Sequence, residues 1–186
     1  FSRDFIDLDS SQWYHKYTDY VIERGLMNGM SQEKFAPNGI LTRGQLVTIL
    51  HRLAGSPTPT GASPFTDVKE GRYYTEAVSW AAEQGLAQGV TETRFVPEAP
   101  ATREQLVTFL YRYAAMHGVD TAAGGSLSNF PDASSVSEYA QQPMLWAVQT
   151  GLLQGMDGRL APKASATRAQ TAAFLTRFCE NILKGE

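Results

Sequence analysis

The stretch Thr42-Arg43-Gly44-Gln45 decides the fold, because the chain of 186 residues contains it three times in related form. The other two copies are Thr102-Arg103-Glu104-Gln105 and Thr167-Arg168-Ala169-Gln170. Thr followed three residues later by Gln is a capping box, in which both side chains satisfy backbone N–H groups at a helix start. We therefore predict a helix beginning at each threonine. The apolar residues that follow at helical spacing are Leu46, Ile49, Leu50 and Leu53, then Leu106, Phe109, Leu110 and Tyr113, then the weaker set Thr171, Phe174, Leu175 and Phe178.

Three further landmarks precede each box. The first is Phe-x-Asp, at Phe5-Ile6-Asp7, Phe65-Thr66-Asp67 and Phe130-Pro131-Asp132. The second is a pair of glycines, at Gly25 and Gly29, Gly85 and Gly89, Gly151 and Gly155. The third is an x-Pro turn, at Phe35-Ala36-Pro37, Phe95-Val96-Pro97 and Leu160-Ala161-Pro162. The interval from the first Phe to the box Arg is constant, although the third copy has one extra residue before its first glycine and one fewer after its second.

Each copy is predicted to be a helix-loop-helix unit. In the first copy a helix spans about Trp13 to Arg24, and Gly25 stands where a left-handed C-cap belongs. The predicted repeats are residues 1–55, 62–117 and 127–183, with Gly/Ser/Thr/Pro-rich linkers between them. A unit of roughly 50 residues has a marginal core alone. We therefore expect an all-α fold in which the three repeats pack into one composite module.

Composition excludes several function classes. The net charge is −3 and the basic residues are scattered, so neither nucleic acid nor an anionic membrane surface is an expected partner. No apolar run approaches the ~20 residues that span a bilayer. Because the sequence begins at Phe1, we interpret it as a mature or excised fragment of a longer protein.

No catalytic or metal-binding motif stands out. The three histidines, His15, His51 and His117, have no metal-ligand spacing, and the single cysteine, Cys179, forms neither an internal disulfide nor a cysteine-based zinc site. Nucleophile-elbow, P-loop and dinucleotide fingerprints are absent from the sequence. We therefore expect a protein that is not an enzyme, with no catalytic residues, no cofactor and no metal.

The box arginines are the strongest candidates for a binding role. Arg43, Arg103 and Arg168 each occupy the first helical position, where the positive end of the helix dipole disfavours a cation by ~0.3–1 kcal/mol. A recurring unfavourable choice indicates a compensating anion. One interpretation is a ligand carboxylate or phosphate held by the guanidinium and nearby helix N–H groups. The other is an internal ion pair with Asp7, Asp67 or Asp132, which we otherwise expect to cap or brace the repeat.

Aromatic and glycine positions recur around the same loops. Trp13, Tyr73 and Tyr139 align at the start of the first helix, where they either stack on a sugar ring or edge the core. Tyr20, Trp80 and Trp146 align well inside that helix and are expected in the core. Gly29, Gly89 and Gly155 indicate either a turn or a close backbone approach to a ligand.

Together these motifs, from Phe5 to Phe178, resemble the S-layer homology (SLH) domain family. The resemblance implies a pseudo-threefold, three-pronged helical module. It also implies a secreted location at the bacterial cell wall and non-covalent binding of secondary cell-wall polysaccharide, often with a pyruvate ketal on a terminal sugar. The implied carbohydrate-binding residues, in grooves between repeats, are Arg43, Arg103, Arg168, Gly29, Gly89, Gly155, Trp13, Tyr73 and Tyr139.

The sequence also departs from the family pattern. The usual Thr-Arg-Ala-Glu is replaced by boxes ending in Gln, and Leu160 replaces the aromatic residue in the third copy. We therefore expect the third groove to be the most degenerate. The alternative function is a helical-repeat scaffold whose grooves bind a peptide or other surface-layer subunits.

Overall fold

The computed structural model describes residues 4–184, so residues 1–3 of the first predicted repeat lie outside the described residues. Within that range the chain forms six α-helices, a few short turns of 3-10 and π helix, and isolated β-bridges without an extended strand. The all-α prediction is confirmed. The helices are α1 (His15–Glu23), α2 (Arg43–Leu53), α3 (Thr75–Glu83), α4 (Arg103–Met116), α5 (Gln141–Gln149) and α6 (Arg168–Arg177).

The predicted capping boxes start α2, α4 and α6. The Thr42 hydroxyl accepts a hydrogen bond from the Gln45 backbone N–H at 3.2 Å, and the Thr42 N–H donates to Gln45 Oε1 at 3.1 Å. Both bonds recur at the other two boxes. Each box therefore fixes where its helix begins and satisfies N–H groups that would otherwise lack a partner.

The glycine that follows each first helix ends it as predicted. Gly25, Gly85 and Gly151 have φ angles of 67°, 69° and 75°, which glycine adopts without steric cost. After α1, the Leu26 N–H donates to Val21 O and the Gly25 N–H donates to Ile22 O, which is the Schellman pattern. Helix α1 is shorter than predicted, so Trp13 lies in the turn before it.

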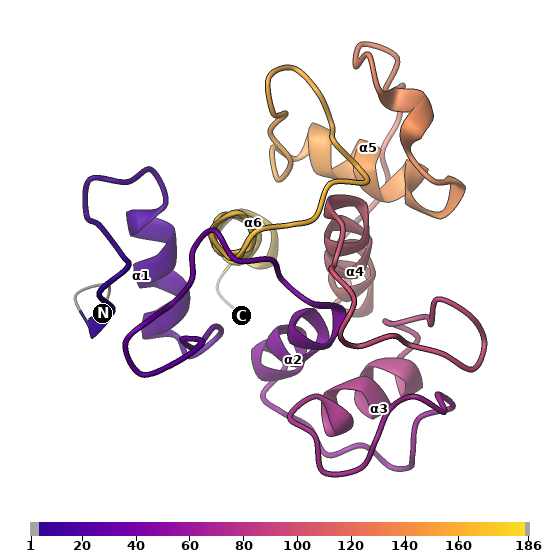
Figure 1. Ribbon diagram of the computed structural model, residues 1–186. Coiled ribbons are helices and arrows are strands. Elements are labelled where there is room, and N and C mark those ends of the chain that lie inside the picture. The colour runs from indigo at the N-terminus through magenta and orange to yellow at the C-terminus, as the bar shows by residue number, and fades with distance from the viewer. Residues whose placement is uncertain (1–3, 185–186) are drawn as a thin grey trace.

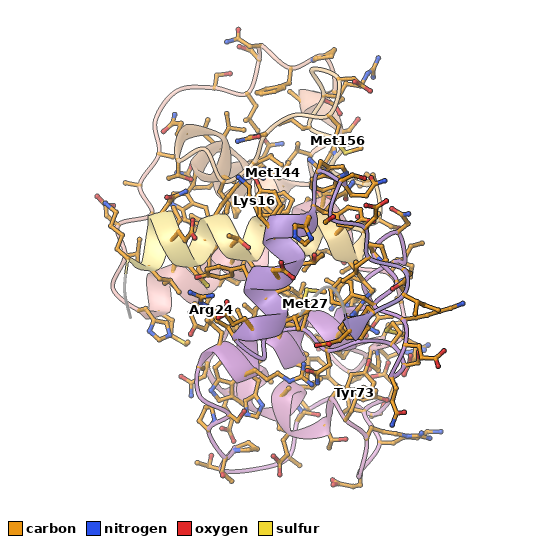
Figure 2. All side chains as sticks on the ribbon, turned by 90° about the vertical axis from the view of Figure 1, so that its left-hand side faces the viewer. Lys16, Arg24, Met27, Tyr73, Met144 and Met156 are labelled. Carbon is orange, nitrogen blue, oxygen red and sulfur yellow. The ribbon has the colours of Figure 1, made fainter. Side chains whose placement is uncertain are left out.

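The helices pair across repeat boundaries. Helix α2 packs on α3, α4 packs on α5, and α6 returns to pack on α1. The result is three prongs around a common centre (Figure 1), and Figure 2 shows α1 crossing α6. Each prong therefore joins the second helix of one repeat to the first helix of another. Because the ring closes, the apolar face of α6 is as buried as those of α2 and α4, and it is not a weak terminal face.

A ring of backbone hydrogen bonds holds the three units at the centre. The Leu41 N–H donates to Ala166 O at 2.9 Å, the Ala101 N–H to Leu41 O at 2.8 Å, and the Ala166 N–H to Ala101 O at 2.9 Å. All three residues are fully buried, and each immediately precedes a capping threonine. This ring places the three helix starts around a pseudo-threefold centre. The contacts that one helix start makes therefore recur, with equivalent residues, at the other two.

Candidate functional site

Three pockets lie beside the three helix starts, and we number them as grooves. Groove 1 is lined by Met27, Asn28, Gly29, Met30, Gln45, Thr48, Ile49, Arg52, Tyr73 and Arg168. Groove 2 is lined by Arg43, Gln88, Gly89, Val90, Gln105, Thr108, Phe109, Arg112 and Tyr139. Groove 3 is lined by Trp13, Arg103, Gln154, Gly155, Met156, Gln170, Ala173, Phe174 and Arg177. Figure 2 labels Met27 and Tyr73 of groove 1 and Met156 of groove 3.

All nine residues predicted from the sequence line these grooves, one of each type per groove. Groove 2, for example, takes Arg43 from the first repeat, Gly89 from the second and Tyr139 from the third. Grooves 1 and 3 are built in the same way, with the contributions of the three repeats exchanged by rotation around the centre. Every groove is therefore built from all three repeats, and no repeat makes one alone. The cavity volumes are about 270, 280 and 210 Å³, below the ~300–1,000 Å³ typical of pockets for drug-sized ligands.

The aspartates of the Phe-x-Asp elements brace the turn beneath each groove. Asp67 accepts hydrogen bonds from the Phe95 N–H at 2.9 Å and the Val96 N–H at 2.8 Å. Val96 has a φ angle of 55°, which a β-branched residue rarely adopts, so the turn needs this support. Burial opposes ionisation of Asp67, but the backbone N–H bonds outweigh it and lower its pKa. Asp7 and Asp132 make the equivalent bonds, so the predicted bracing role is confirmed.

Each braced turn presents a carbonyl to an arginine of another repeat. Arg43 Nε donates to Phe95 O at 2.9 Å, Arg168 Nε to Phe35 O at 2.8 Å, and Arg103 Nε to Leu160 O at 3.2 Å. The three side chains are only 2–4% exposed, and desolvation lowers the pKa of each. Arginine nevertheless stays protonated in proteins. Within residues 4–184 no acidic group forms an ion pair with them, so their positive charge is not neutralised by direct contact.

The helix N–H groups, by contrast, are already used. The Arg43 N–H donates to Ala99 O at 2.9 Å and the Gly44 N–H to Pro97 O at 2.8 Å, both in the loop of the next repeat. The same pair of bonds occurs at the other two helix starts. The suggestion that helix N–H groups help to hold a ligand anion is therefore wrong, because neighbouring loop carbonyls occupy them. At these positions only the guanidinium groups remain available as donors to a ligand anion.

The recurring glycines allow close packing, and their φ angles are not positive. A Cβ atom on Gly89 would lie 2.2 Å from Thr91 O and 2.6 Å from the Phe65 ring, and Gly29 is equally crowded by Ser31 O and Phe5. Gly155 is looser, since its nearest neighbour would be Arg159 O at 3.1 Å. Glycine at the first two positions is thus required by the loop itself, and the absent side chain also leaves the groove open.

The predicted aromatic residues form the outer wall of each groove. Trp13, Tyr73 and Tyr139 are 58%, 56% and 48% exposed, so none of them is a core residue. Two of the rings are supported by a buried neighbour, Trp13 by Tyr14 at a centroid distance of 5.6 Å and Tyr73 by Tyr74 at 5.1 Å. The second aromatic set behaves as expected at Trp80 and Trp146, which are buried, while Tyr20 is only partly buried.

The S-layer homology domain family matches the chain three times, over residues 4–47, 64–107 and 129–172. The chain belongs to this family. It is 26% identical over 181 residues to an amylopullulanase of Thermoanaerobacterium thermosulfurigenes, covering 97% of this chain and 10% of that protein. It is 29% identical over 166 residues to the surface-layer 125 kDa protein of Lysinibacillus sphaericus, covering 87% and 14%. It is 23% identical over 176 residues to the S-layer protein sap of Bacillus anthracis, covering 94% and 21%.

These matches place the chain among the S-layer homology modules of secreted, cell-wall-associated proteins. The module spans only a small part of each relative, whether that relative is a surface-layer protein or an enzyme. None of the described helices is long and apolar enough to cross a membrane. The described residues also contain no cluster of three His, Cys, Asp or Glu side chains that suits a metal ion.

The structure adds a second arginine to each S-layer homology groove, which sequence reasoning missed. Arg52, Arg112 and Arg177 follow the box arginines at a constant interval, and that regularity was a usable signal. Arg52 donates to Leu26 O at 3.3 Å and Arg112 to Leu86 O at 3.2 Å. Each groove is thus lined by two guanidinium groups, and the described linings include no acidic side chain. The local charge is positive although the whole chain is acidic.

A buried carboxylate at groove 2 was also missed. Glu104 is 2% exposed and accepts hydrogen bonds from the Ser137 hydroxyl at 2.7 Å, the Tyr139 hydroxyl at 3.3 Å and Lys163 Nζ at 2.6 Å. Burial opposes its ionisation, but the Lys163 and Ser137 bonds prevail and lower the pKa of Glu104. Gly44 and Ala169 hold the matching positions, so only the wall of groove 2 is tied down in this way.

Proposed function

We propose that this module anchors a larger protein non-covalently to the bacterial cell wall by binding secondary cell-wall polysaccharide in its three grooves. The observation that carries the proposal is the threefold recurrence of one groove with two arginines, a half-exposed aromatic ring and no lining acid. An enzyme's active site is ordinarily a single asymmetric constellation, whereas a repeated groove suits a repeated ligand. The module itself is proposed to be non-catalytic.

The paired arginines favour an acidic sugar. A guanidinium group offers several donors in a planar fork that matches a carboxylate. In groove 2 the Arg43 Nε and Nη2 atoms are engaged by Phe95 O and Gln88 O, and no described group accepts a bond from its Nη1. A ketal carboxylate on a terminal pyruvylated sugar would supply an acceptor and neutralise charge. The small volume of each groove also suits one terminal sugar.

The aromatic wall favours a carbohydrate over a simple anion. A half-exposed Trp or Tyr ring offers a flat apolar face and a polar edge, which suits the mixed surface of a sugar ring. Such a ring leaves ample apolar area in water until a ligand covers it. Arginine and aromatic together therefore specify both the charge and the ring of an acidic sugar.

Three weak grooves on one rigid module would act together. Once the first sugar is bound, the second contact becomes intramolecular and gains from a high effective concentration. A wall polymer with many chain ends supplies such ligands. Tight attachment then needs no single strong site.

Sedimentation with purified cell-wall sacculi tests the proposal. The variant Trp13→Ala/Tyr73→Ala/Tyr139→Ala removes all three aromatic walls, and we expect it to stay in the supernatant while the wild type pellets. The matched control is Ile6→Ala/Ile40→Ala/Met116→Ala, which removes exposed apolar side chains that line none of the grooves. Circular dichroism should show equal helix content in all three proteins. Normal sedimentation of the aromatic variant would contradict the proposal.

Sacculi stripped of polysaccharide by hydrofluoric acid separate the two candidate partners. Under the proposal the wild type no longer pellets with stripped sacculi. A protein scaffold that contacts other surface-layer subunits would show no dependence on the sugar. Loss of binding on stripping, together with loss in the aromatic variant, identifies the grooves as the polysaccharide site.

A further inference from the structure

We infer that the three grooves are not equivalent and that groove 3, bounded by Trp13, Arg103 and Arg177, is the strongest acidic-sugar site of the module. The inference rests on the proposed function and ranks the sites that it assigns. It reverses the expectation from sequence, in which the irregular third copy had the most degenerate groove. The inference rests on the hydrogen-bond contacts of the two arginines of groove 3 and on a second aromatic ring beside Trp13.

The first difference lies at the box arginine. In grooves 1 and 2 the arginine Nη2 donates to a loop carbonyl, from Arg168 to Asn28 O and from Arg43 to Gln88 O. Arg103 keeps only its Nε bond to Leu160 O, and its Nη2 atom is buried without a hydrogen-bond partner among the described residues. A buried charged donor without an acceptor is costly, so a ligand that supplies the acceptor recovers that cost on binding.

The second difference lies at the other arginine of the groove. Arg52 and Arg112 each donate to a backbone carbonyl of the first-helix cap, at Leu26 and Leu86. Arg177 instead reaches the Gln154 side chain at 3.5 Å, a long and exposed contact, and lies over the Tyr17 ring at 5.4 Å. Its guanidinium thus lacks the backbone carbonyl contact that holds Arg52 and Arg112, so it turns toward a ligand at lower cost.

The irregularity of the third repeat explains the change at the box arginine. Its loop after Gly155 is one residue shorter than the loops after Gly29 and Gly89. The shorter loop closes through two backbone hydrogen bonds between Met156 and Arg159, with Asp157 and Gly158 at φ angles of 52° and 76°. Positive φ at both central residues is the tight type I′ hairpin. The loop therefore follows a different path from its counterparts, and its Gln154 carbonyl does not reach Arg103.

Groove 3 also continues beyond its own lining. Trp13 is followed along α1 by Tyr17, whose ring centroid lies 6.3 Å from that of Trp13. Ala77 and Pro143 hold the matching positions in the other repeats, so neither of the other grooves has this second ring. With Arg177 over Tyr17, the surface offers a place for the sugar that precedes the acidic terminal residue. Gln154 and Met156 are exposed, so they change rotamer without repacking the core when a carboxylate approaches Arg103.

A nuclear magnetic resonance titration distinguishes the grooves, because each has its own reporter. The probe is a methyl glycoside that carries one pyruvate ketal, with the ketal-free glycoside as control. Trp13 is the exposed tryptophan while Trp80 and Trp146 are buried, so its indole N–H signal reports groove 3. Ring signals of Tyr73 and Tyr139 report grooves 1 and 2. One additional charge-assisted hydrogen bond corresponds to roughly a tenfold gain in affinity, so Trp13 should reach half-saturation at about one tenth of the concentration.

Saturation of Tyr73 or Tyr139 before Trp13, or of all three together, would overturn the ranking and leave the proposed function intact. A silent titration at all three reporters overturns both. Lysine variants give an independent check on the free Nη2 atom. Arg43→Lys and Arg168→Lys each lose two carbonyl contacts, whereas Arg103→Lys loses one. The thermal midpoint of the Arg103→Lys variant should therefore fall least. In the same variant, groove 3 should lose its tenfold advantage in affinity. An equal fall in all three midpoints would show that Nη2 of Arg103 has a partner.

Discussion

The two walls of each groove differ in how far they belong to the fold. The arginine wall, formed by the box arginines Arg43, Arg103 and Arg168, is buried, and its side chains hold the turns of a neighbouring repeat. The aromatic wall stands half in solvent. The arginines therefore serve two purposes at once, since they join the repeats and keep a cation beside the cavity. The aromatic residues mainly serve the cavity, and among them Tyr139 also bonds a buried group, through its 3.3 Å hydrogen bond to Glu104. A ligand-binding test that removes arginines confuses folding with recognition, and a test that removes aromatic residues does not.

The largest expected effect on stability is at the arginine wall. Arg43→Ala leaves the Phe95 and Gln88 carbonyls without their charged donor and opens a cavity at the interface of the first two repeats. We expect a loss of about 3 kcal/mol in the free energy of unfolding, measured by urea denaturation. A loss below ~1 kcal/mol would show that the arginine wall is not structural, and the contrast between the walls would fail.

The glycines beneath the walls provide the next test. Gly89→Ala forces a Cβ atom against the Thr91 carbonyl, while Gly155→Ala meets only a contact that small shifts relieve. We expect a destabilisation of about 2–3 kcal/mol for the first and less than ~1 kcal/mol for the second. Thermal unfolding of the pair measures the difference. Equal midpoints would contradict the looser loop assigned to groove 3.

Much of this architecture was predictable, because local rules and the global fold agree. The capping boxes predict the starts of α2, α4 and α6, and the cap glycines predict the ends of α1, α3 and α5. The nine groove residues followed from matched positions combined with family resemblance.

What the sequence did not show is which surfaces meet. Helical periodicity predicts that one face of a helix is buried, but it does not identify the element that packs against that face. The pairing of α6 with α1 could therefore not be predicted from the sequence. The acceptors of the arginines could not be predicted either, because every residue carries a backbone carbonyl and the sequence does not show which one accepts a hydrogen bond. Arg52, Arg112 and Arg177 were overlooked although their spacing was regular, because arginine on a solvated helix face is ordinary.

The brace beneath the arginine wall predicts a pH dependence. The folded-state pKa of Asp67 lies below its ordinary value of 3.8, so its contribution to stability is full above that value and is lost as the pH falls through the lower folded value. Asp67→Asn should cost about 1 kcal/mol at neutral pH and flatten the acid limb of the stability curve. Unfolding midpoints between about pH 5 and pH 2.5 measure this, since the window lies around and below the ordinary pKa. An unchanged acid limb would contradict the bracing role.

The smallest expected effect on stability is at the aromatic wall. Tyr73→Ala removes an exposed ring whose hydroxyl has one weak contact, with Thr42 Oγ at 3.5 Å. The free energy of unfolding should change by no more than ~0.5 kcal/mol, as for most surface substitutions. Binding of groove 1 to an acidic sugar should nevertheless fall, measured by the loss of ligand-induced shifts at groove 1 residues such as Met30. A large loss of stability would mean that this wall, too, belongs to the fold.

Calorimetric titration of the intact module with purified wall polysaccharide, before and after chemical removal of its pyruvate ketals, tests the central claim most directly. Guanidinium groups that hold a ketal carboxylate predict saturable binding to the native polymer and a loss of roughly tenfold or more in affinity once the ketals are gone. Equal affinity for the two polymers would contradict the account, because the paired arginines of the grooves would then have no part in recognising the wall.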